Sequence, residues 1–378
     1  MSFDRHDIYT IDEKTFRNGF FQIRGWAFDR ETLTPIQNII IASDNELEAS
    51  PTIHLRVASP DVEQAWGAEA SYARFSVDIP LNSRSNLATI LSSKLILVFN
   101  DVKHVSVDLF PRTLQFHGNN FQNIKVGVGI TTYNRSSVIA ETIENLRSNA
   151  FLPLEIFISD DGSTDGTPDV LAGIKNICWL SEQNRGIAWN KNRTLFYLQQ
   201  IAQCDVILLI EDDVRATGPD WDIGWVLATL IHHHINYAPD WYPSTFPGQA
   251  VWNHPLESEI LTGQCSGFTR TALNYVGYLD SRFRQYGHEH VEHTMRMIRA
   301  GYGGTLLKEG TRDCRFLSIN NGLTVLDSES SGNPEAIREN GIIFDAIWNE
   351  SIYRQAWRTD EQMKTLRSEM EKITFNPQ

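Results

Sequence analysis

Two patterns of apolar and polar residues divide the chain at about residue 115. Before that point, apolar residues alternate with polar ones in short segments separated by turn-forming residues. Alternation with a period of two is typical of strands with one buried face, and several such strands at this spacing predict an antiparallel β-sandwich. The segments expected to form strands are 20–28, 36–42, 52–57, 73–81, 94–99 and 104–109.

Beyond residue 125, short continuous apolar runs alternate with helix-like segments. Runs of four to eight apolar residues are typical of strands buried on both faces of a parallel sheet. Ile139, Ile143 and Leu146 have the spacing of one helix face, and Thr167-Pro168 predicts a helix start with Thr167 as the N-cap. This order predicts an α/β domain with a doubly wound, mostly parallel sheet. The expected strands are 126–130, 155–159, 177–180 and 206–210, with a helix over 188–201.

The change of pattern predicts four parts. We expect a β-sandwich accessory domain at 1–115, a polar linker at 116–124, the α/β domain at 125–325 and a helical C-terminal extension at 326–378. The extension is rich in Glu, Arg and Lys, with an apolar stretch at 342–348, so we expect one or two helices packed on the α/β domain or on a partner subunit. The sequence leaves a homo-oligomer open.

Composition and charge exclude several classes of protein. The net charge of −14 argues against a nucleic-acid-binding protein, which would need a basic face. No apolar stretch is long enough for a transmembrane segment, and residues 1–7 lack the apolar core of a signal peptide. The four cysteines have no CxxC spacing, so neither a zinc site nor a disulfide framework is indicated. We therefore expect a cytoplasmic protein.

The acidic triplet Glu211-Asp212-Asp213 directly follows the apolar run 206–210. Three carboxylates at the end of a buried strand repel one another unless a cation lies among them. Mg²⁺ or Mn²⁺ chelated to a diphosphate would suit this position, because hard divalent cations take oxygen ligands. The alternative is a solvated acidic loop.

Polar segments also follow the other predicted strands, and together they carry a family resemblance. They are 131–135 (Thr-Thr-Tyr-Asn-Arg), 160–166 (Asp-Asp-Gly-Ser-Thr-Asp-Gly), 184–193 (Asn-Arg-Gly-Ile-Ala-Trp-Asn-Lys-Asn-Arg) and 211–213. In order and spacing they resemble family 2 glycosyltransferases of the GT-A fold, over roughly residues 125–310. The pattern at 24–29 (Arg-Gly-Trp-Ala-Phe-Asp) is similar to β-sandwich modules beside bacterial glycosyltransferase domains. We expect that module to serve assembly or positioning, with sugar stacking on Trp26 and Trp66 as the alternative.

The resemblance implies a nucleotide-sugar site. In the family, the segment matching Thr132-Tyr133 lines the nucleobase slot, and a carboxylate at Asp160-Asp161 accepts from a base N–H, which favours uracil. Asn190 and Arg193 lie one helical turn apart and are expected to reach the diphosphate; their alternative is ordinary helix surface. The triplet matches the metal motif, with Glu in place of the usual first Asp. The expected nucleotide-sugar-binding residues are thus Thr132, Tyr133, Arg135, Asp160, Asp161, Asn190, Arg193, Glu211 and Asp212, and the expected Mn²⁺ or Mg²⁺ ligands are Asp213 and then Asp212.

The segment 286–296 resembles the family's acceptor-side helix. Inverting transfer needs a general base for the acceptor hydroxyl, and relatives often carry Glu-Asp where this chain has Glu289-His290. The sequence favours Glu289 as the base over His290, and the missing Asp leaves a retaining outcome open beside the expected inversion. Glu289, Glu292, His293 and Arg296 are spaced to share one helix face, where an internal Glu292–Arg296 ion pair is the structural alternative. The expected acceptor-side residues are Gly267, Glu292 and Trp252.

Three further features bear on the site. Many GT-A enzymes add a histidine as a third metal ligand, but none follows His293, so Asp313, Cys314, Asn320 or water would replace it. His232-His233-His234 is expected to be a helix end rather than a metal site. The aromatic stretch 240–255 is expected either to contact the acceptor or close over the donor, or to pack on the surface.

These observations predict a metal-dependent glycosyltransferase that moves a sugar, most readily from a UDP-sugar, to a hydroxyl acceptor. A sugar-phosphate nucleotidylyltransferase would need a Gly-rich, basic loop after the first strand, and residues 131–135 are not one. A carbohydrate-binding or scaffolding protein on a degenerate GT-A core is the other alternative, and the intact carboxylates argue against it.

Overall fold

The computed structural model describes residues 9–29, 31–32, 34–43, 45–111, 114, 121–326 and 333–377. The chain divides into two compact units, Met1–Asn123 and Ile124–Gln378. Most of the predicted linker, residues 116–120, lies outside the described residues. Within the described residues, no helix is long and apolar enough to cross a membrane.

Among its described residues, the first unit contains two antiparallel sheets and the helices α1 and α2. One sheet has the order β1-β2-β6-β5, with β3 paired to β2, and the other has the order β4-β7-β8. Its strands are β1 (Tyr9–Arg17), β2 (Phe20–Asp29), β3 (Thr34–Pro35), β4 (Asn38–Ala42), β5 (Thr52–Val57), β6 (Arg74–Pro80), β7 (Lys94–Val98) and β8 (His104–Asp108). The helices are α1 (Pro60–Trp66) and α2 (Arg84–Ser92).

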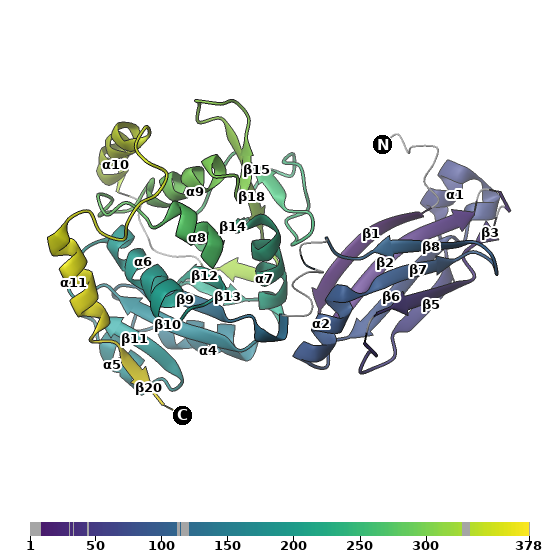
Figure 1. Cartoon of the computed structure of the whole chain (residues 1–378), viewed down its shortest axis with the longest axis horizontal. Coiled ribbons are helices and arrows are strands. Elements are labelled where there is room, and N and C mark those ends of the chain that lie inside the picture. The colour runs from purple at the N-terminus through teal and green to yellow at the C-terminus, as the bar shows by residue number, and fades with distance from the viewer. Residues whose placement is uncertain are drawn as a thin grey trace. The chain divides into compact units, whose positions relative to one another are not determined.

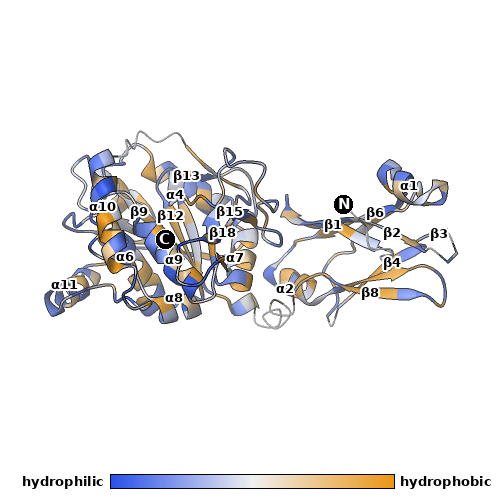
Figure 2. Cartoon of the chain, turned by 90° about the horizontal axis from the view of Figure 1, so that it is seen from above, coloured by the Kyte–Doolittle hydropathy of each residue, from blue (hydrophilic) through white to orange (hydrophobic). Residues whose placement is uncertain are grey.

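Alternating burial explains how these strands pack. In β6 every second residue is buried, namely Phe75, Val77 and Ile79, so one face of the sheet is apolar. Figure 2 separates β1, β2 and β6 from β4 and β8 into two layers. The structure thus agrees in part with the predicted sandwich. Trp26 is only 4% exposed and packs against Trp66, which leaves little of its face for stacking on a sugar.

The second unit is built on a ten-stranded sheet of order β15-β18-β14-β16-β12-β9-β10-β11-β20, with β17 paired to β18. Its first strands, β9 (Val126–Thr132), β10 (Leu154–Asp160), β11 (Ile177–Ser181) and β12 (Val206–Glu211), are parallel, as the apolar runs predict. The remaining strands make the sheet mixed rather than mostly parallel: β14 (His234–Tyr237), β15 (Leu256–Ser258), β16 (Cys265–Thr269), β17 (Gly304–Leu306), β18 (Cys314–Ile319) and β20 (Thr374–Asn376). A separate ribbon pairs β13 (Val214–Ala216) with β19 (Leu323–Val325).

Helices cover both sides of the parallel strands, with α4 and α5 on one side and α6 on the other (Figure 1). They are α4 (Ile139–Ser148), α5 (Thr167–Gly173), α6 (Ile187–Phe196), α7 (Trp221–His232), α8 (Arg270–Val276) and α9 (Glu289–Arg299). A Cβ on Gly129 of β9 would lie 2.0 Å from the Thr194 side chain, so glycine there lets α6 approach the sheet. The N-cap of α5 is Gly166, not the predicted Thr167. The helix predicted over 188–201 is α-helical up to Phe196 and continues as a π-helical turn over Tyr197–Ile201.

Strand order places the site. β9 pairs with β10 on one side and β12 on the other: the chain runs from β9 to β10 and β11 in one direction, and then crosses back to β12 on the other side of β9. In such sheets, ligands bind beyond the carboxyl ends of the strands at the point where the direction reverses. Thr131 and Thr132 end β9 there, and Glu211, which pairs with Thr131, ends β12.

The C-terminal residues return to this sheet. The extension forms α10 (Pro334–Ile347) and α11 (Asp360–Met370), which agrees with the expected one or two helices. It also forms β20, which pairs antiparallel with β11 and which the sequence did not predict.

Candidate functional site

A cavity of about 320 Å³ lies at the carboxyl ends of β9, β10 and β12. We call it the donor cavity. It gathers seven of the nine expected nucleotide-sugar-binding residues: Thr132, Tyr133, Arg135, Asp161, Asn190, Glu211 and Asp212. The four polar segments therefore meet at one edge of the sheet, as the predicted strand order requires.

Asp161 is held by backbone and side-chain donors. Its Oδ1 accepts from Arg185 N at 3.0 Å and from Arg193 Nη1 at 2.9 Å, and its Oδ2 accepts from Gly186 N at 3.0 Å. Burial raises the pKa of Asp161, against the lowering effect of these donors. A carboxylate oxygen can accept two hydrogen bonds, so Oδ2 can take one more donor from a cavity ligand.

Asp160 and Arg193, the other two expected residues, do not line the donor cavity. Asp160 is fully buried, and it accepts from both the backbone N–H and the hydroxyl of Ser163 and from the Ser181 hydroxyl, so it fixes the turn after β10. Arg193 is also fully buried, between Asp161 and Glu369 of α11. The expectation that Arg193 reaches a diphosphate is not met in this structure, because both ends of its guanidinium are engaged beneath the cavity.

The acidic triplet lies at the end of β12 as predicted. Glu211 and Asp212 line the donor cavity, and the Arg135 guanidinium lies 3.4 Å from Asp212 Oδ1. Burial, with further contributions from the charges of Glu211 and Asp213, raises the pKa of Asp212 to about 7. Asp213 is half-buried and outside the cavity lining, and its carbonyl accepts from Leu326 N.

These carboxylates fit a divalent cation that is shared with a ligand. No cluster of three or more His, Cys, Asp or Glu able to hold a metal occurs among the residues that the structure describes. Mg²⁺ in particular is commonly bound by one or two carboxylates plus substrate phosphates, with no all-protein cage. Of the substitutes considered for a third ligand, Asp313 and Cys314 line a different cavity, and Asn320 donates to Asp240.

Lys191 connects the donor side of the site to α9. Its side chain is 2% exposed, and its Nζ lies 3.0 Å from Glu211 Oε1 and 3.4 Å from Glu289 Oε1. Burial opposes its charge, but the two carboxylates raise the pKa of Lys191 above its usual value. Sequence analysis missed this residue, although it lies between Asn190 and Arg193 in the same motif, because its partners are distant in sequence.

Glu289 and His290 form a hydrogen-bonded pair at the start of α9. Glu289 is 1% exposed; its Oε2 accepts from Gly287 N at 3.0 Å, and its Oε1 lies 3.3 Å from His290 Nδ1. Burial alone would raise the pKa of Glu289, but the charges of His290 and Lys191 hold it below its usual value. Since an ionised carboxylate only accepts, Nδ1 of His290 carries the hydrogen, and Nε2 is the ring nitrogen left to accept one.

The expected acceptor-side residues lie away from the donor cavity. Gly267 is in the middle of β16, where a Cβ would lie 2.2 Å from the Thr229 hydroxyl of α7, so it serves packing. Trp252 is fully buried. Tyr242 of the stretch 240–255 is also buried, in a small apolar cluster with Ala238 and Leu256, which agrees with the surface-packing alternative.

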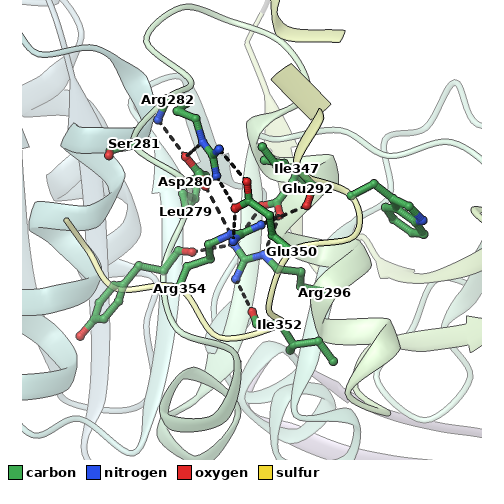
Figure 3. Close-up of polar contacts among 12 residues, drawn as sticks. Leu279, Asp280, Ser281, Arg282, Glu292, Arg296, Ile347, Glu350, Ile352 and Arg354 are labelled. Carbon is green, nitrogen blue, oxygen red and sulfur yellow. Dashed lines mark hydrogen bonds and ion pairs between the residues drawn. The ribbon is translucent and has the colours of Figure 1, made fainter. Parts of the chain in front are cut away.

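Glu292 belongs to an ion-pair network instead (Figure 3). Its carboxylate pairs with Arg296 at 2.8 Å, as the structural alternative predicts, and lies 3.8 Å from Arg354. The network continues through Arg354 to Asp280 and Glu350, both of which also pair with Arg282. Figure 3 shows the three carboxylates and three guanidiniums pointing toward one another, which ties α9 to the residues after α10.

Seven further residues that line the donor cavity were not among the predicted site residues. They come from the strand end at Thr131, the loop before α6 and the loop before α9: Thr131, Asn184, Gly186, Ile187, Arg284, Gln285 and Tyr286. The loop before α6 was part of the quoted motif and offered a signal. In the loop before α9, Tyr286 begins the segment 286–296 that resembles the family. Arg284 and Gln285 offered no signal, because they reach the cavity only through the fold: a Cβ on Gly186 would lie 2.2 Å from the Arg284 carbonyl oxygen.

The family model described as glycosyl transferase family 2 matches residues 127–300. That range contains every residue that lines the donor cavity. The second unit thus resembles family 2 glycosyltransferases over this range. The resemblance carried by the four polar segments is thereby confirmed.

Two relatives are also named as glycosyltransferases. Over 198 residues, or 45% of this chain and 60% of the relative, the glycosyltransferase domain is 26% identical to the glucosyl-dolichyl phosphate glucuronosyltransferase of Haloferax volcanii. It is 28% identical over 198 residues, 48% of this chain and 76% of the relative, to an uncharacterized glycosyltransferase of Acanthamoeba polyphaga mimivirus.

Solved glycosyltransferase structures also match part of the chain. A mannosyltransferase from Pyrobaculum calidifontis in complex with GDP-Man and Mn²⁺ is 20% identical, with a TM-score of 0.37, over 47% of this chain and 53% of that one. TarS from S. aureus is 16% identical, with a TM-score of 0.43, over 66% of this chain and 43% of that one.

Proposed function

We propose that this protein transfers a sugar from a nucleotide-sugar, with UDP as the nucleotide, to a hydroxyl group of a glycan or other acceptor. The observation that carries the proposal is that one cavity, within the range of the family 2 match, is lined by Asp161 and also by Glu211 and Asp212. Asp161 has an acceptor position for a base N–H, and uracil offers such a donor beside its carbonyl groups. The carboxylates of Glu211 and Asp212 suit the cation that accompanies a diphosphate.

In this proposal, Asp212 and Asp213 would hold Mn²⁺ or Mg²⁺ together with the diphosphate. The bound ion would stabilise the charge that develops on the departing nucleotide diphosphate. Arg135, which lies next to Asp212, adds a positive charge on the same side of the donor cavity. Asn190 is held by Ser159, whose hydroxyl donates to Asn190 Oδ1, and so presents a fixed amide to the cavity.

For the proton of the acceptor hydroxyl, the geometry supports His290 better than the Glu289 favoured by sequence. Glu289 is almost inaccessible and engaged by Gly287 N, Lys191 and His290, whereas the His290 side chain is 14% exposed. The acceptor oxygen would bond to the anomeric carbon while the bond from that carbon to the diphosphate oxygen breaks. Nε2 of His290 would take the hydroxyl proton, and Glu289 would orient the ring and stabilise its charged form, as the carboxylate does in catalytic triads. A single displacement of this kind inverts the anomeric configuration.

Calorimetry with UDP, in the presence and absence of Mn²⁺, tests the proposal. We expect UDP to bind at least about tenfold more tightly with Mn²⁺, a difference of about 1.4 kcal/mol, and Asp213→Ala to remove that difference. ADP serves as the control for base recognition and should bind more weakly than UDP. Absence of metal-dependent UDP binding to the wild-type protein would contradict the proposed function.

A further inference from the structure

A second cavity, of about 380 Å³, adjoins the donor cavity. The two cavities share Asn184, Gly186, Arg284 and Gln285 in their linings, so they form one continuous groove. Sites for small ligands typically measure about 300–1,000 Å³, so the donor cavity alone is at the lower end of that range. The second cavity therefore provides room for a group beyond the nucleotide.

The lining of the second cavity is basic and rich in amides. It includes two arginines, Arg185 and Arg284, and three glutamines, Gln183, Gln285 and Gln362. Among the described residues that line it, none is acidic, although the whole chain carries a net charge of −14. A basic lining in an acidic protein favours a negatively charged ligand.

Arg284 has a free charge at the junction of the two cavities. Its side chain is exposed, and within the described part of the chain no carboxylate forms an ion pair with it. Its backbone is fixed, because its carbonyl accepts from Ile187 N at 3.1 Å. Arg284 can therefore turn its guanidinium toward a ligand in either cavity without breaking a contact.

Arg185, by contrast, is held in place. Its Nε lies 3.2 Å from Glu369 Oε1, its guanidinium lies 5.6 Å from the centre of the Trp189 ring, and its backbone N–H donates to Asp161. The Arg185 side chain is still 37% exposed, so its guanidinium can donate to a second, negatively charged group. The second cavity thus has one guanidinium that is held in place, on Arg185, and one that can turn, on Arg284. Together they provide the paired donors that carboxylate and phosphate groups prefer.

We propose that the second cavity binds a saccharide group that carries a carboxylate or a phosphate. The charge would pair with Arg185 and Arg284, and the sugar hydroxyls would bond to the amides of Gln183, Gln285 and Gln362, which both donate and accept. This inference rests on the proposed function and adds the charge of the sugar to it. The anionic sugar is either the donor's own sugar or a separate acceptor. A donor sugar is covalently linked to UDP, whereas an acceptor binds as a free sugar beside bound UDP.

The first experiment measures donor discrimination by calorimetry with Mn²⁺ present. If the charge belongs to the donor, UDP-glucuronic acid binds at least about tenfold more tightly than UDP-glucose, since a charge-assisted pair contributes about 1.5–3 kcal/mol. Arg185→Gln and Arg284→Gln should each remove most of that difference. Arg367→Gln is the matched control, because Arg367 is exposed on α11 and lines neither cavity.

The second experiment measures binding of free glucuronic acid, glucose 1-phosphate and neutral methyl glucoside to protein saturated with UDP and Mn²⁺, and separately to nucleotide-free protein. If the charge belongs to an acceptor, an anionic sugar binds the UDP-saturated protein at least about tenfold more tightly than methyl glucoside, and both Arg→Gln variants reduce this. The inference is overturned if neither experiment shows a preference for the anion, if UDP displaces the anionic sugar, or if the variants behave like Arg367→Gln. Failure of UDP itself to bind would contradict the proposed function instead, and the nucleotide-free measurement would still test the second cavity.

Discussion

Lys191 is the residue on which the charge balance of the site depends. It is the cation next to both Glu211 and Glu289, and it is buried together with Glu289. Removing one member of a buried ion pair leaves the other charge uncompensated, which is more damaging than replacing the whole pair. Lys191 lies in the polar segment 184–193 of the sequence, but only the fold shows that its charge pairs with Glu211 at the end of β12 and with Glu289 at the start of α9.

We therefore predict that Lys191→Met lowers the free energy of unfolding by about 3–5 kcal/mol, and that Lys191→Arg, which keeps the charge, lowers it by less. Urea unfolding followed by tryptophan fluorescence measures both changes. Lys364→Met, on an exposed position of α11, is the control and should change stability by less than about 0.5 kcal/mol. A loss below about 1 kcal/mol for Lys191→Met would show that the buried carboxylate of Glu289 does not need this partner.

The pairing of Glu289 with His290 leads to a second prediction at the residue scale. His290→Gln should reduce kcat by about 10²–10⁴-fold, the usual contribution of a general base, while the affinity for UDP stays within about twofold. Glu289→Gln should also reduce kcat, and it should in addition lower stability, because Gly287 N and Lys191 lose an ionised partner. If His290→Gln retains full turnover and Glu289→Gln does not, the base is Glu289.

At the scale of elements, α11 supports Asp161, the residue proposed to bind the nucleobase. Glu369 of α11 accepts from Trp189 Nε1 at 2.9 Å and from Arg193 Nε at 3.0 Å, and Arg193 in turn holds Asp161. Burial works against ionisation of Glu369, but Arg193, Trp189 and Arg185 bring its pKa below the usual value. A helix outside the matched family range thus positions a residue inside it.

Glu369→Gln should therefore weaken UDP binding by about tenfold, because Arg193 loses its carboxylate partner and Asp161 loses its fixed orientation. The effect should depend on the nucleobase: the affinity for UDP falls toward the affinity for ADP, whereas the increase in affinity on adding Mn²⁺ is unchanged. Calorimetry with both nucleotides gives this comparison. Glu371→Gln is the matched control, since Glu371 is exposed at the end of the same helix. An equal loss for UDP and ADP would indicate general destabilisation rather than positioning.

At the scale of the whole molecule, buried histidines make the stability of the fold depend on pH. His234 is fully buried in β14 between Gly267 and Thr294, and burial lowers its pKa to about 4. The unfolded chain, in which the pKa of histidine is about 6.5, binds more protons than the folded protein as the pH falls. The contribution that a neutral His234 makes to the free energy of unfolding is therefore fully present above pH 6.5 and is lost as the pH falls toward 4.

We predict that His234 alone removes about 2 kcal/mol of stability between pH 7 and pH 5. Asp222, whose pKa is raised to about 6 by burial, acts in the opposite direction, so the informative quantity is the difference between variants. The pH dependence of the free energy of unfolding should be shallower for His234→Gln than for the wild type. It should be unchanged for His254→Gln, whose histidine is exposed. Parallel curves for wild type and His234→Gln would refute the assignment.

Sequence patterns predicted the parts of this molecule that depend on local order. The apolar runs at 126–130 and 206–210 could only be buried strands, and the polar residues after them had to meet at one sheet edge. Arg193 shows where such reasoning stops. Its spacing of one helical turn from Asn190 suggested that both side chains reach a diphosphate. In the structure Arg193 pairs with Glu369, 176 residues away, and no local sequence pattern predicts that contact. The three-residue strand β20 was missed for the same reason.

The return of the C-terminal residues to the sheet also orders events during synthesis. Every residue that lines the donor cavity has been translated by residue 286, yet the helix that fixes Arg193 ends at Met370. At about 5–20 residues per second, the 176 residues between Arg193 and Glu369 take roughly 9–35 s to translate. Once residue 286 has been added, a nascent chain holds a complete set of cavity residues, while Arg185 and Arg193 still lack their partner Glu369. Nucleotide recognition is therefore expected to mature late, after α11 has left the ribosome and docked.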